Sequence, residues 1–215
     1  YFPVTSIAIE DVNLYWKGYP EGLFIDDEMV VYNNGETTPT NPGIKIISSS
    51  NPDIAEPLRD AYLSCKGIGS SVITVAAIDD ESVTTTFTVN VLSGLEAIRM
   101  DGDNTYFYNR YSSDEETIYL PTPLFDWIMD ESGAPVVGDN TDESYTMTSN
   151  SPDIVRIDEK IEGDLPVYQA VSLKKGTATI TYTSTYDPDK TATLTVIVSQ
   201  YPSEVKITKV GATEV

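Results

Sequence analysis

Acidic side chains gather in three short turns that could bind calcium: Asp79-Asp-Glu, Asp101-Gly-Asp-Asn and Asp187-Pro-Asp. Calcium prefers oxygen ligands, and such loops could stiffen a domain junction. The ligand spacing of a calcium-binding helix–loop–helix is absent, and Asp-Gly and Asp-Pro-Asp are also ordinary turn formers. We therefore expect no cofactor, and calcium at these turns is the metal alternative that the sequence leaves open.

Catalytic chemistry has few starting points in this chain. There is no histidine, so the Ser-His and Cys-His nucleophile pairs and the commonest zinc ligand are missing. A pair of carboxylates about 5–10 Å apart could hydrolyse a glycoside. With 34 Asp and Glu in the chain, however, such pairs arise by chance. We predict that the protein is not an enzyme, and we assign no catalytic, cofactor-binding or metal-ligating residue.

Aromatic side chains are the second candidate for ligand contacts. The chain has 14 tyrosines and two tryptophans, with clusters at Leu14-Tyr-Trp and Tyr106-Phe-Tyr. Aromatic faces can stack on sugars. The clusters recur at places that look equivalent in the two halves, which favours a shared structural role in closing one end of a domain. Trp127 lies on an alternating strand and is predicted to pack in the core.

Charge and cysteine content exclude several classes of protein. The formal net charge is −21, with 13 basic and 34 acidic residues spread over both halves. Nucleic-acid backbones and anionic lipid surfaces would repel such a surface. The single cysteine, Cys65, allows no intrachain disulfide and is predicted to be a small buried hydrophobe. No apolar run is long enough to insert into a membrane.

The chain is organised around an internal repeat. Residues 69–91 (GSSVITVAAIDDESVTTTFTVNV) align without a gap with residues 176–198 (GTATITYTSTYDPDKTATLTVIV), and nine of 23 positions are identical. Each copy is predicted to form two strands with an apolar face and a threonine-lined face. A chain that is built twice on one β-unit is a tandem array.

Alternating apolar residues and frequent turn residues predict an all-β fold of two tandem immunoglobulin-like (Ig-like) antiparallel β-sandwiches. Gly35 and Gly133 are predicted to supply turn positions with positive φ. Pro52 and Pro152 begin matched turns, which the aspartates that follow could cap. The predicted domains are residues 1–93, the first copy, and 94–200, the second copy. Residues 201–215 are predicted to be a linker and the first strand of a third copy, which suggests a chain cut from something longer.

Three motifs resemble those of bacterial Ig-like domains of group 2, the type found in invasin and intimin. They are the turns Ser-Asn-Pro-Asp-Ile-Ala (50–55) and Asn-Ser-Pro-Asp-Ile-Val (150–155), the strand Gly-Thr-Ala-Thr-Ile-Thr (176–181), and the closing Thr-Val-x-Val (88–91 and 195–198). The second copy departs from the pattern by predicted acidic insertions at 112–119 and 138–144. The resemblance implies a sandwich from a bacterial surface, adhesin or cell-wall-linked protein or a phage virion, without a catalytic site.

We therefore expect a structural or adhesive module of a bacterial cell-surface or secreted protein, which acts as a semi-rigid spacer or a presenting surface. Its partners would be neighbouring Ig-like repeats, with a host surface protein or a glycan as further candidates. The alternatives are a carbohydrate- or protein-binding module, or accessory domains of a surface enzyme or phage virion protein. A spacer predicts no concave aromatic or acidic pocket. A binding module predicts one, at residues 112–119 or 138–144.

Overall fold

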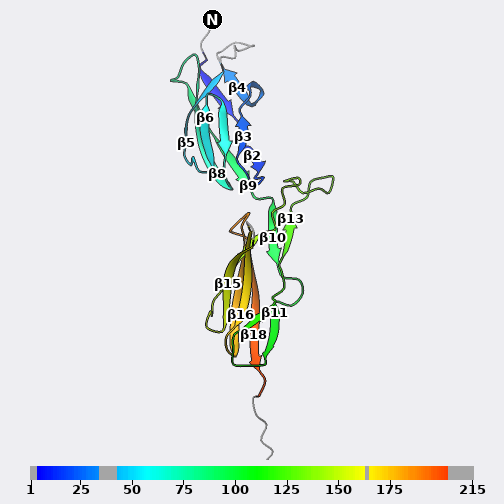
Figure 1. The fold of residues 1–215 in the computed structure, drawn as a ribbon. Helices are drawn as coiled ribbons and strands as arrows, with labels where there is room; N and C mark the ends of the chain where they lie inside the picture. Colours follow the sequence, from blue (N-terminus) through cyan, green and yellow to red (C-terminus); the bar gives the residue numbers. More distant parts are fainter. Residues whose placement is uncertain (1–3, 34–42, 163–164, 203–215) are drawn as a thin grey trace, which may run out of the picture. The chain divides into compact units, whose positions relative to one another are not determined.

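A computed structural model describes residues 4–33, 43–162 and 165–202 of the chain. Over these residues the protein is built from β-strands, with one short 3-10 helix at Asp27–Met29 and no α-helix (Figure 1). No helix within this part is long and apolar enough to cross a membrane. The predicted all-β fold class is confirmed.

The chain divides into two compact units. The first comprises Tyr1–Glu96 and Asp126–Glu143, and the second comprises Ala97–Phe125 and Ser144–Val215. The domain boundary predicted between residues 93 and 94 stays a prediction. The strand of a third copy, predicted within residues 201–215, lies almost entirely outside the described residues.

The larger sheet of the first unit has the strand order β2-β9-β8-β5. β2 runs parallel to β9, and the other neighbours are antiparallel. The hairpin of β8 and β9 is the strand pair that the repeat predicted. The four strands are β2 (Val12–Tyr15), β5 (Ile44–Ser49), β8 (Gly69–Ala77) and β9 (Thr84–Leu92).

A second sheet of three strands, in the order β3-β7-β6, completes the first sandwich, and β1 pairs separately with β4. All these pairs are antiparallel. The strands are β1 (Ser6–Ile9), β3 (Glu21–Phe24), β4 (Val30–Asn33), β6 (Ala55–Arg59) and β7 (Tyr62–Cys65).

The two sheets of the second unit repeat this topology, and β10 and β13, the counterparts of β1 and β4, have residues in both units. Its sheets have the orders β11-β18-β17-β14 and β12-β16-β15, and β10 pairs with β13. In both units, one sheet holds strands equivalent to C, F and G of an immunoglobulin domain and the other holds B, E and D. The strands are β10 (Leu95–Arg99), β11 (Thr105–Arg110), β12 (Glu116–Ile118), β13 (Leu124–Trp127), β14 (Tyr145–Ser149), β15 (Val155–Glu162), β16 (Leu165–Ser172), β17 (Gly176–Ser184) and β18 (Thr191–Gln200).

Each unit has its own core, which follows from the alternation of side chains along its strands. In the first unit, Ile73 and Val75 of β8 and Phe87 and Val89 of β9 are buried, while Thr84, Thr86 and Thr88 lie on the other face of β9. Cys65 is fully buried, as predicted. The core of the second unit uses the equivalent positions: Ile180, Tyr182, Leu194, Val196 and Val198.

Strand register corrects one predicted insertion. Glu21 lies opposite Cys65 and Glu116 lies opposite Ser172, at equivalent places in the two units. Tyr15 and Asn109 also occupy equivalent positions, opposite Leu92 and Ser199, so the segment that leads to Glu116 is only one residue longer than the one that leads to Glu21. The predicted long insertion at 112–119 is wrong, because most of these residues have counterparts in the first copy.

Real length differences lie elsewhere. β6 and β7 extend over residues 55–65, whereas β15 and β16 extend over 155–172, so this hairpin is seven residues longer in the second unit. The segment from Ile118 to Tyr145 is six residues longer than its counterpart from Leu23 to Ile44. The predicted insertion at 138–144 lies within this longer segment.

The two aromatic clusters lie on equivalent strands, but not at equivalent positions. Val12 lies opposite Val89 on β9, and Tyr106 lies opposite Val196, the repeat equivalent of Val89. Tyr106 therefore corresponds to Val12, so the clusters are displaced by two residues. Leu14 and Trp16 pack against the first core, and Tyr106 and Tyr108 against the second, with Phe107 exposed. Four of the six cluster residues thus pack against a core, whereas the predicted equivalence of the clusters is wrong, and a role in closing one end of a domain stays a prediction.

The predicted turns have the expected backbone but partly different caps. Gly133 has φ of 82°, as its turn requires, and Gly35 lies outside the described residues. In the turn that contains Pro52, the side chain of Asn51 accepts a hydrogen bond from the backbone N–H of Asp53. The carboxylate of Asp153 instead pairs with Lys174 at 2.5 Å.

Candidate functional site

Two of the three acidic turns that suggested calcium use a carboxylate as a turn cap. Asp80 Oδ1 accepts hydrogen bonds from the backbone N–H and the hydroxyl of Ser82, at 3.0 and 2.6 Å. Asp187 is buried, and its Oδ1 accepts from the backbone N–H of Asp189. Across the described residues, no three Asp, Glu, His or Cys side chains converge as a metal site would require.

The second unit carries a concave site that is rich in tyrosine, here called the tyrosine groove. It has a volume of about 390 Å³. None of its lining residues is acidic, although the chain has 34 acidic residues, and Lys160 is its one charged residue. The lining consists of Thr117, Ile118, Tyr119, Leu120, Pro121, Thr122, Tyr145, Met147, Lys160, Val167, Tyr168, Gln169, Ala170 and Tyr182.

Five strands (β12, β14, β15, β16 and β17) and one connection position this lining. The groove lies where β12 continues into residues 119–122, next to the start of β14 and to the hairpin of β15 and β16. Tyr168 and Gln169 are neighbours on β16, and such neighbours face opposite sides of a sheet. The lining therefore draws on both the core side and the outer side of the β12-β16-β15 sheet.

The tyrosines on the core side are held in place by packing. The rings of Tyr145 and Tyr182 lie 5.5 Å apart between centroids, and the Tyr182 hydroxyl donates to the backbone oxygen of Pro121 at 3.0 Å. Burial raises the pKa of Tyr182 and of Tyr145 above the usual tyrosine range. The pKa of Tyr168 is raised as well, by partial burial and by the charge of Glu159. These phenols stay neutral at physiological pH. Tyr119 is different, because its side chain is 86% exposed.

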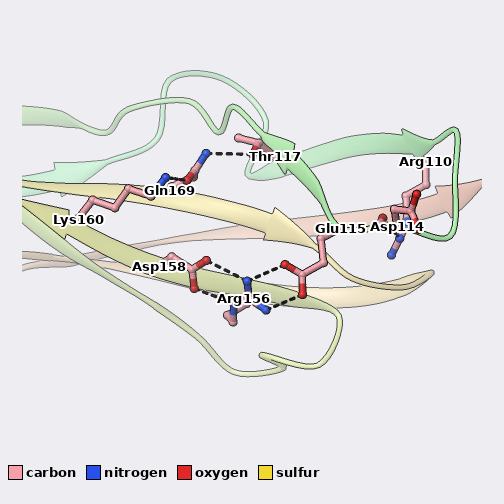
Figure 2. Close-up of polar contacts among 8 residues, drawn as sticks. All are labelled: Arg110, Asp114, Glu115, Thr117, Arg156, Asp158, Lys160 and Gln169. Carbon is pink, nitrogen blue, oxygen red and sulfur yellow. Dashed lines mark hydrogen bonds and ion pairs between the residues drawn. The ribbon is translucent and has the colours of Figure 1, made fainter.

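A line of polar side chains crosses the outer side of the sheet beside the groove (Figure 2). Gln169 Nε2 donates to Thr117 Oγ1 at 2.9 Å, and the Lys160 ammonium donates to Gln169 Oε1. The amide of Gln169 therefore has a fixed orientation between the strands β12 and β15. Lys160 itself is in none of the ion pairs among the described residues.

An ion-pair network stabilises the same face (Figure 2). The Arg156 guanidinium donates to both carboxylate oxygens of Glu115 at 3.0 Å, and to Asp158 at 2.7 and 3.0 Å. These hydrogen bonds lower the pKa of both carboxyls and raise the pKa of Arg156. The network connects the residue before β12 to β15, so it fixes the strand that leads into the groove.

The loop 111–115 is built around one carboxylate. Glu116 accepts hydrogen bonds from the backbone N–H groups of Tyr111 and Ser112, at 3.1 and 2.8 Å, and from the Tyr108 hydroxyl at 2.8 Å. These donors lower the pKa of Glu116, while burial and the Glu116 carboxylate raise that of Tyr108 to about 12. Under this loop lies Arg110, which is 1% exposed and donates through Nη2 to the backbone oxygen of Asp114 (Figure 2).

The first unit has a groove at the equivalent place, with a volume of about 350 Å³. Strand register makes Phe24 equivalent to Tyr119, Ile44 equivalent to Tyr145, and Tyr62 equivalent to Gln169. The position is thus a property of the sandwich, whereas the lining is specific to each unit. The lining residues of this first-unit groove are Phe24, Ile25, Asp27, Gly43, Ile44, Arg59, Asp60, Ala61, Tyr62 and Ile78.

The sequence predicted part of the tyrosine groove. Thr117 to Tyr119 fall in the segment where a binding module was expected to have a pocket, and Tyr145 directly follows the segment 138–144. The prediction missed Lys160, Tyr168 and Gln169, which lie on the longer hairpin of β15 and β16. The sequence did contain a signal for this longer hairpin. The two copies are offset by 100 residues at Pro52 and Pro152 but by 107 at Gly69 and Gly176.

No protein-family model and no curated protein sequence matches the chain. Among solved structures, it is similar to the surface layer protein SbsC, domains 4–9, with 16% identity and a TM-score of 0.30. That match covers 92% of this chain and 32% of the other, so this chain spans about a third of its length. A structure of SbsC domains 5–6 matches with 16% identity and a TM-score of 0.30, over 91% of this chain and 98% of the other.

A fragment of intimin, solved in complex with the intimin-binding domain of the translocated intimin receptor, is also similar. The identity is 13% and the TM-score 0.27, over 92% of this chain and 64% of the other. Scores this low carry no conclusion about this protein. The assignment of the fold rests on the strand order of its two sandwiches.

Proposed function

We propose that this chain is a non-catalytic structural module of a bacterial cell-surface or secreted protein, a semi-rigid spacer that presents neighbouring domains. The observation that carries the proposal is the repetition of one strand topology, with a separate core in each unit. Only Ser93 and Gly94 separate β9 from β10. A connection this short limits the freedom of two consecutive domains. The partners that such a module needs first are further repeats of the same kind.

The ionisable groups support a non-catalytic role. A general acid needs a carboxyl group with a raised pKa. Within the described residues, hydrogen bonds lower the pKa of six carboxyls: Asp80, Glu115, Glu116, Asp130, Asp153 and Asp158. The chain also has no histidine to act as a base.

The assignment to a bacterial surface rests on the resemblance of the Asn-Pro-Asp and Ser-Pro-Asp turns and of the closing strands to group 2 bacterial Ig-like domains. The fold is compatible with it, because the matched turns have the same hydrogen bonds in both units. The backbone N–H groups of Ile54 and Ala55 donate to the backbone oxygen of Asn51, and those of Ile154 and Val155 donate to the backbone oxygen of Ser151.

The spacer role can be tested by NMR relaxation on the whole chain. We expect amides of both units to report one common rotational correlation time. Insertion of Gly-Ser-Gly-Ser between Ser93 and Gly94, at the predicted boundary between the two copies, is the matched variant, and it should give the amides of β8 and those of β17 different and shorter correlation times. Independent tumbling of the units in the parent chain would contradict the proposal.

The tyrosine groove favours a second role, that of a binding module. A spacer needs no concave aromatic site, whereas a binding module needs one, and the second unit has it at a place where the chain also carries extra residues. The two roles are compatible, since a spacer domain can also hold a ligand.

A further inference from the structure

We infer that the tyrosine groove binds a short carbohydrate that carries a carboxylate, of the uronic-acid or sialic-acid type. This inference builds on the binding role proposed above and is independent of the spacer role. It starts from charge. A carboxylate in the lining would repel an anion, and the groove has none, while Lys160 supplies a positive charge. In a chain of net charge −21, the lining itself thus holds no carboxylate, although the charges of Asp158 and Glu159 act on Lys160 and Tyr168 from neighbouring positions of β15.

The hydrogen-bonding capacity that remains in the groove is mostly donor capacity. Lys160 has three N–H donors and uses one of them on Gln169. Gln169 uses one of its two amide protons on Thr117, whose hydroxyl accepts that bond and keeps its own proton. The three side chains therefore present free donors next to one another. A ligand that satisfies them must be rich in acceptors, which fits the carboxylate, ring and hydroxyl oxygens of an acidic sugar.

The aromatic residues supply the other half of a sugar site. Sugar rings have apolar C–H faces, which pack on aromatic side chains. Tyr119 lines the groove and is 86% exposed, so its ring is available to a ligand without rearrangement of the core. Tyr168 adds a half-buried phenol from β16, which stays neutral and can both donate and accept.

An acidic peptide is the competing ligand, and the strand pairing argues against it. An extended peptide commonly binds by adding to an unpaired strand edge. Thr117 and Gln169 belong to β12 and β16, and β16 has paired neighbours on both sides. At its centre, on β16, the polar line therefore offers side chains only. β12 and β15 are the edges of this sheet, and a peptide that adds to either edge would run along the strands and not along the polar line, which crosses them.

The first-unit groove serves as an internal comparison. There, Phe24 and Ile44 replace Tyr119 and Tyr145, and the lining includes the acidic residues Asp27 and Asp60. The Arg59 guanidinium lies over the Tyr62 ring, 5.4 Å from its centre, so a cation already covers the aromatic surface of this groove. The first-unit groove thus lacks the polar line that Thr117, Gln169 and Lys160 form in the second unit, and we expect no acidic sugar to bind there.

The test is calorimetric titration of the full chain with sialyllactose and with trimers of galacturonic acid, using lactose as the neutral counterpart. We expect saturable binding of at least one acidic sugar and at least about tenfold weaker binding of lactose, because a charge-assisted hydrogen bond is lost. Lys160→Gln should weaken acidic-sugar binding about tenfold, and Tyr119→Ala about fivefold. NMR amide shifts should concentrate at residues 117–122 and 167–170.

The controls are Lys174→Gln and Tyr111→Ala, an exposed lysine and an exposed tyrosine of the same unit that lie outside the groove. Their binding should match the parent chain, and circular dichroism should show all four variants folded. Three results would each overturn the inference: no saturable binding of either acidic sugar, equal binding of lactose, or tighter binding of a glutamate-rich peptide that depends on Lys160. None of them alters the relaxation test of the spacer role.

Discussion

Ile154 packs directly over the Cα atom of Gly176. A Cβ atom at Gly176 would lie 2.6 Å from Ile154 Cδ1, and the φ angle of Gly176 is 152°. The first unit has the same pair, with a Cβ at Gly69 meeting Ile54 Cδ1 at 2.9 Å and φ of 143°. Both copies thus have this pair of a glycine and an isoleucine, because the isoleucine after the proline turn packs on the start of β8 in the first unit and of β17 in the second.

Replacement of this glycine should destabilise the second unit. We expect Gly176→Ala to lower the free energy of unfolding by about 1–2 kcal/mol, since alanine is strained at that φ and its methyl group meets Ile154. Urea denaturation would measure the loss. Adding Ile154→Val removes the Cδ1 methyl, so the double variant should recover only the steric part of the loss. Gly67→Ala is the control, because the nearest atom to its added Cβ lies 3.9 Å away, and its stability should stay within about 0.5 kcal/mol of the parent.

Stability should depend on pH through the cradle around Glu116. Its hydrogen bonds lower the pKa in the folded state below the ordinary value of 4.5. The stabilisation is therefore complete above pH 4.5 and is lost as the pH falls through the lower, folded-state pKa. Glu116→Gln should be less stable than the parent at neutral pH, and the difference should shrink towards about pH 3. Urea unfolding at both pH values measures this, and a difference that is constant with pH would contradict the role of the charge.

Arg110 is expected to contribute little stability despite its burial. Its Nε and Nη1 atoms have no hydrogen-bond partner among the described residues, so the charge is desolvated with little compensation. Arg110→Met keeps much of the volume and removes the charge. We expect its melting temperature to equal or exceed that of the parent, and its free energy of unfolding to be higher by up to about 2 kcal/mol. A fall of several degrees would show that the hydrogen bond to Asp114 outweighs the desolvation of the charge.

Cys65 can report the unfolding of the first unit. It is the single cysteine and is fully buried, and burial raises the pKa of its thiol to about 11. A buried, protonated thiol does not react with alkylating reagents. At about pH 8, labelling should therefore proceed only through opening of this unit, and its rate should rise steeply with urea. Rapid labelling without denaturant would contradict the described packing.

Calcium should not change the stability of the described part of the chain. The turns at Asp80 and Asp187 use a carboxylate as a cap for a neighbouring N–H group, and no three ligands converge within the described residues. We expect the same melting temperature in excess calcium and in excess chelator. A reproducible rise with calcium, absent with magnesium, would reopen the alternative that the sequence left open.

Much of the fold was readable from the sequence because its signals are local. Alternation predicted the hairpin of β8 and β9 and its copy, and proline turns predicted the matched corners at Pro52 and Pro152. The tyrosine groove was readable only in part, because it depends on pairing between distant strands. Nothing local shows that Gln169 lies between Thr117 and Lys160, and the register that puts them together is set by the whole β12-β16-β15 sheet. The predicted equivalence of the two aromatic clusters was wrong for the same reason, since position along the chain did not reveal their displacement by two residues.

The parallel pairing of β11 with β18 has a consequence for mechanical load. In the sequence, β11 lies near the start and β18 near the end of the second unit. In space, the two strands run side by side in the same direction. A pull on the two ends of the unit would drag the strands past each other lengthwise, so that the ladder is loaded in shear and its bonds resist together instead of opening one at a time. The register runs over six residue pairs in β11 and β18 but over four in β2 and β9. Under tension, the first unit would therefore be the weaker of the two.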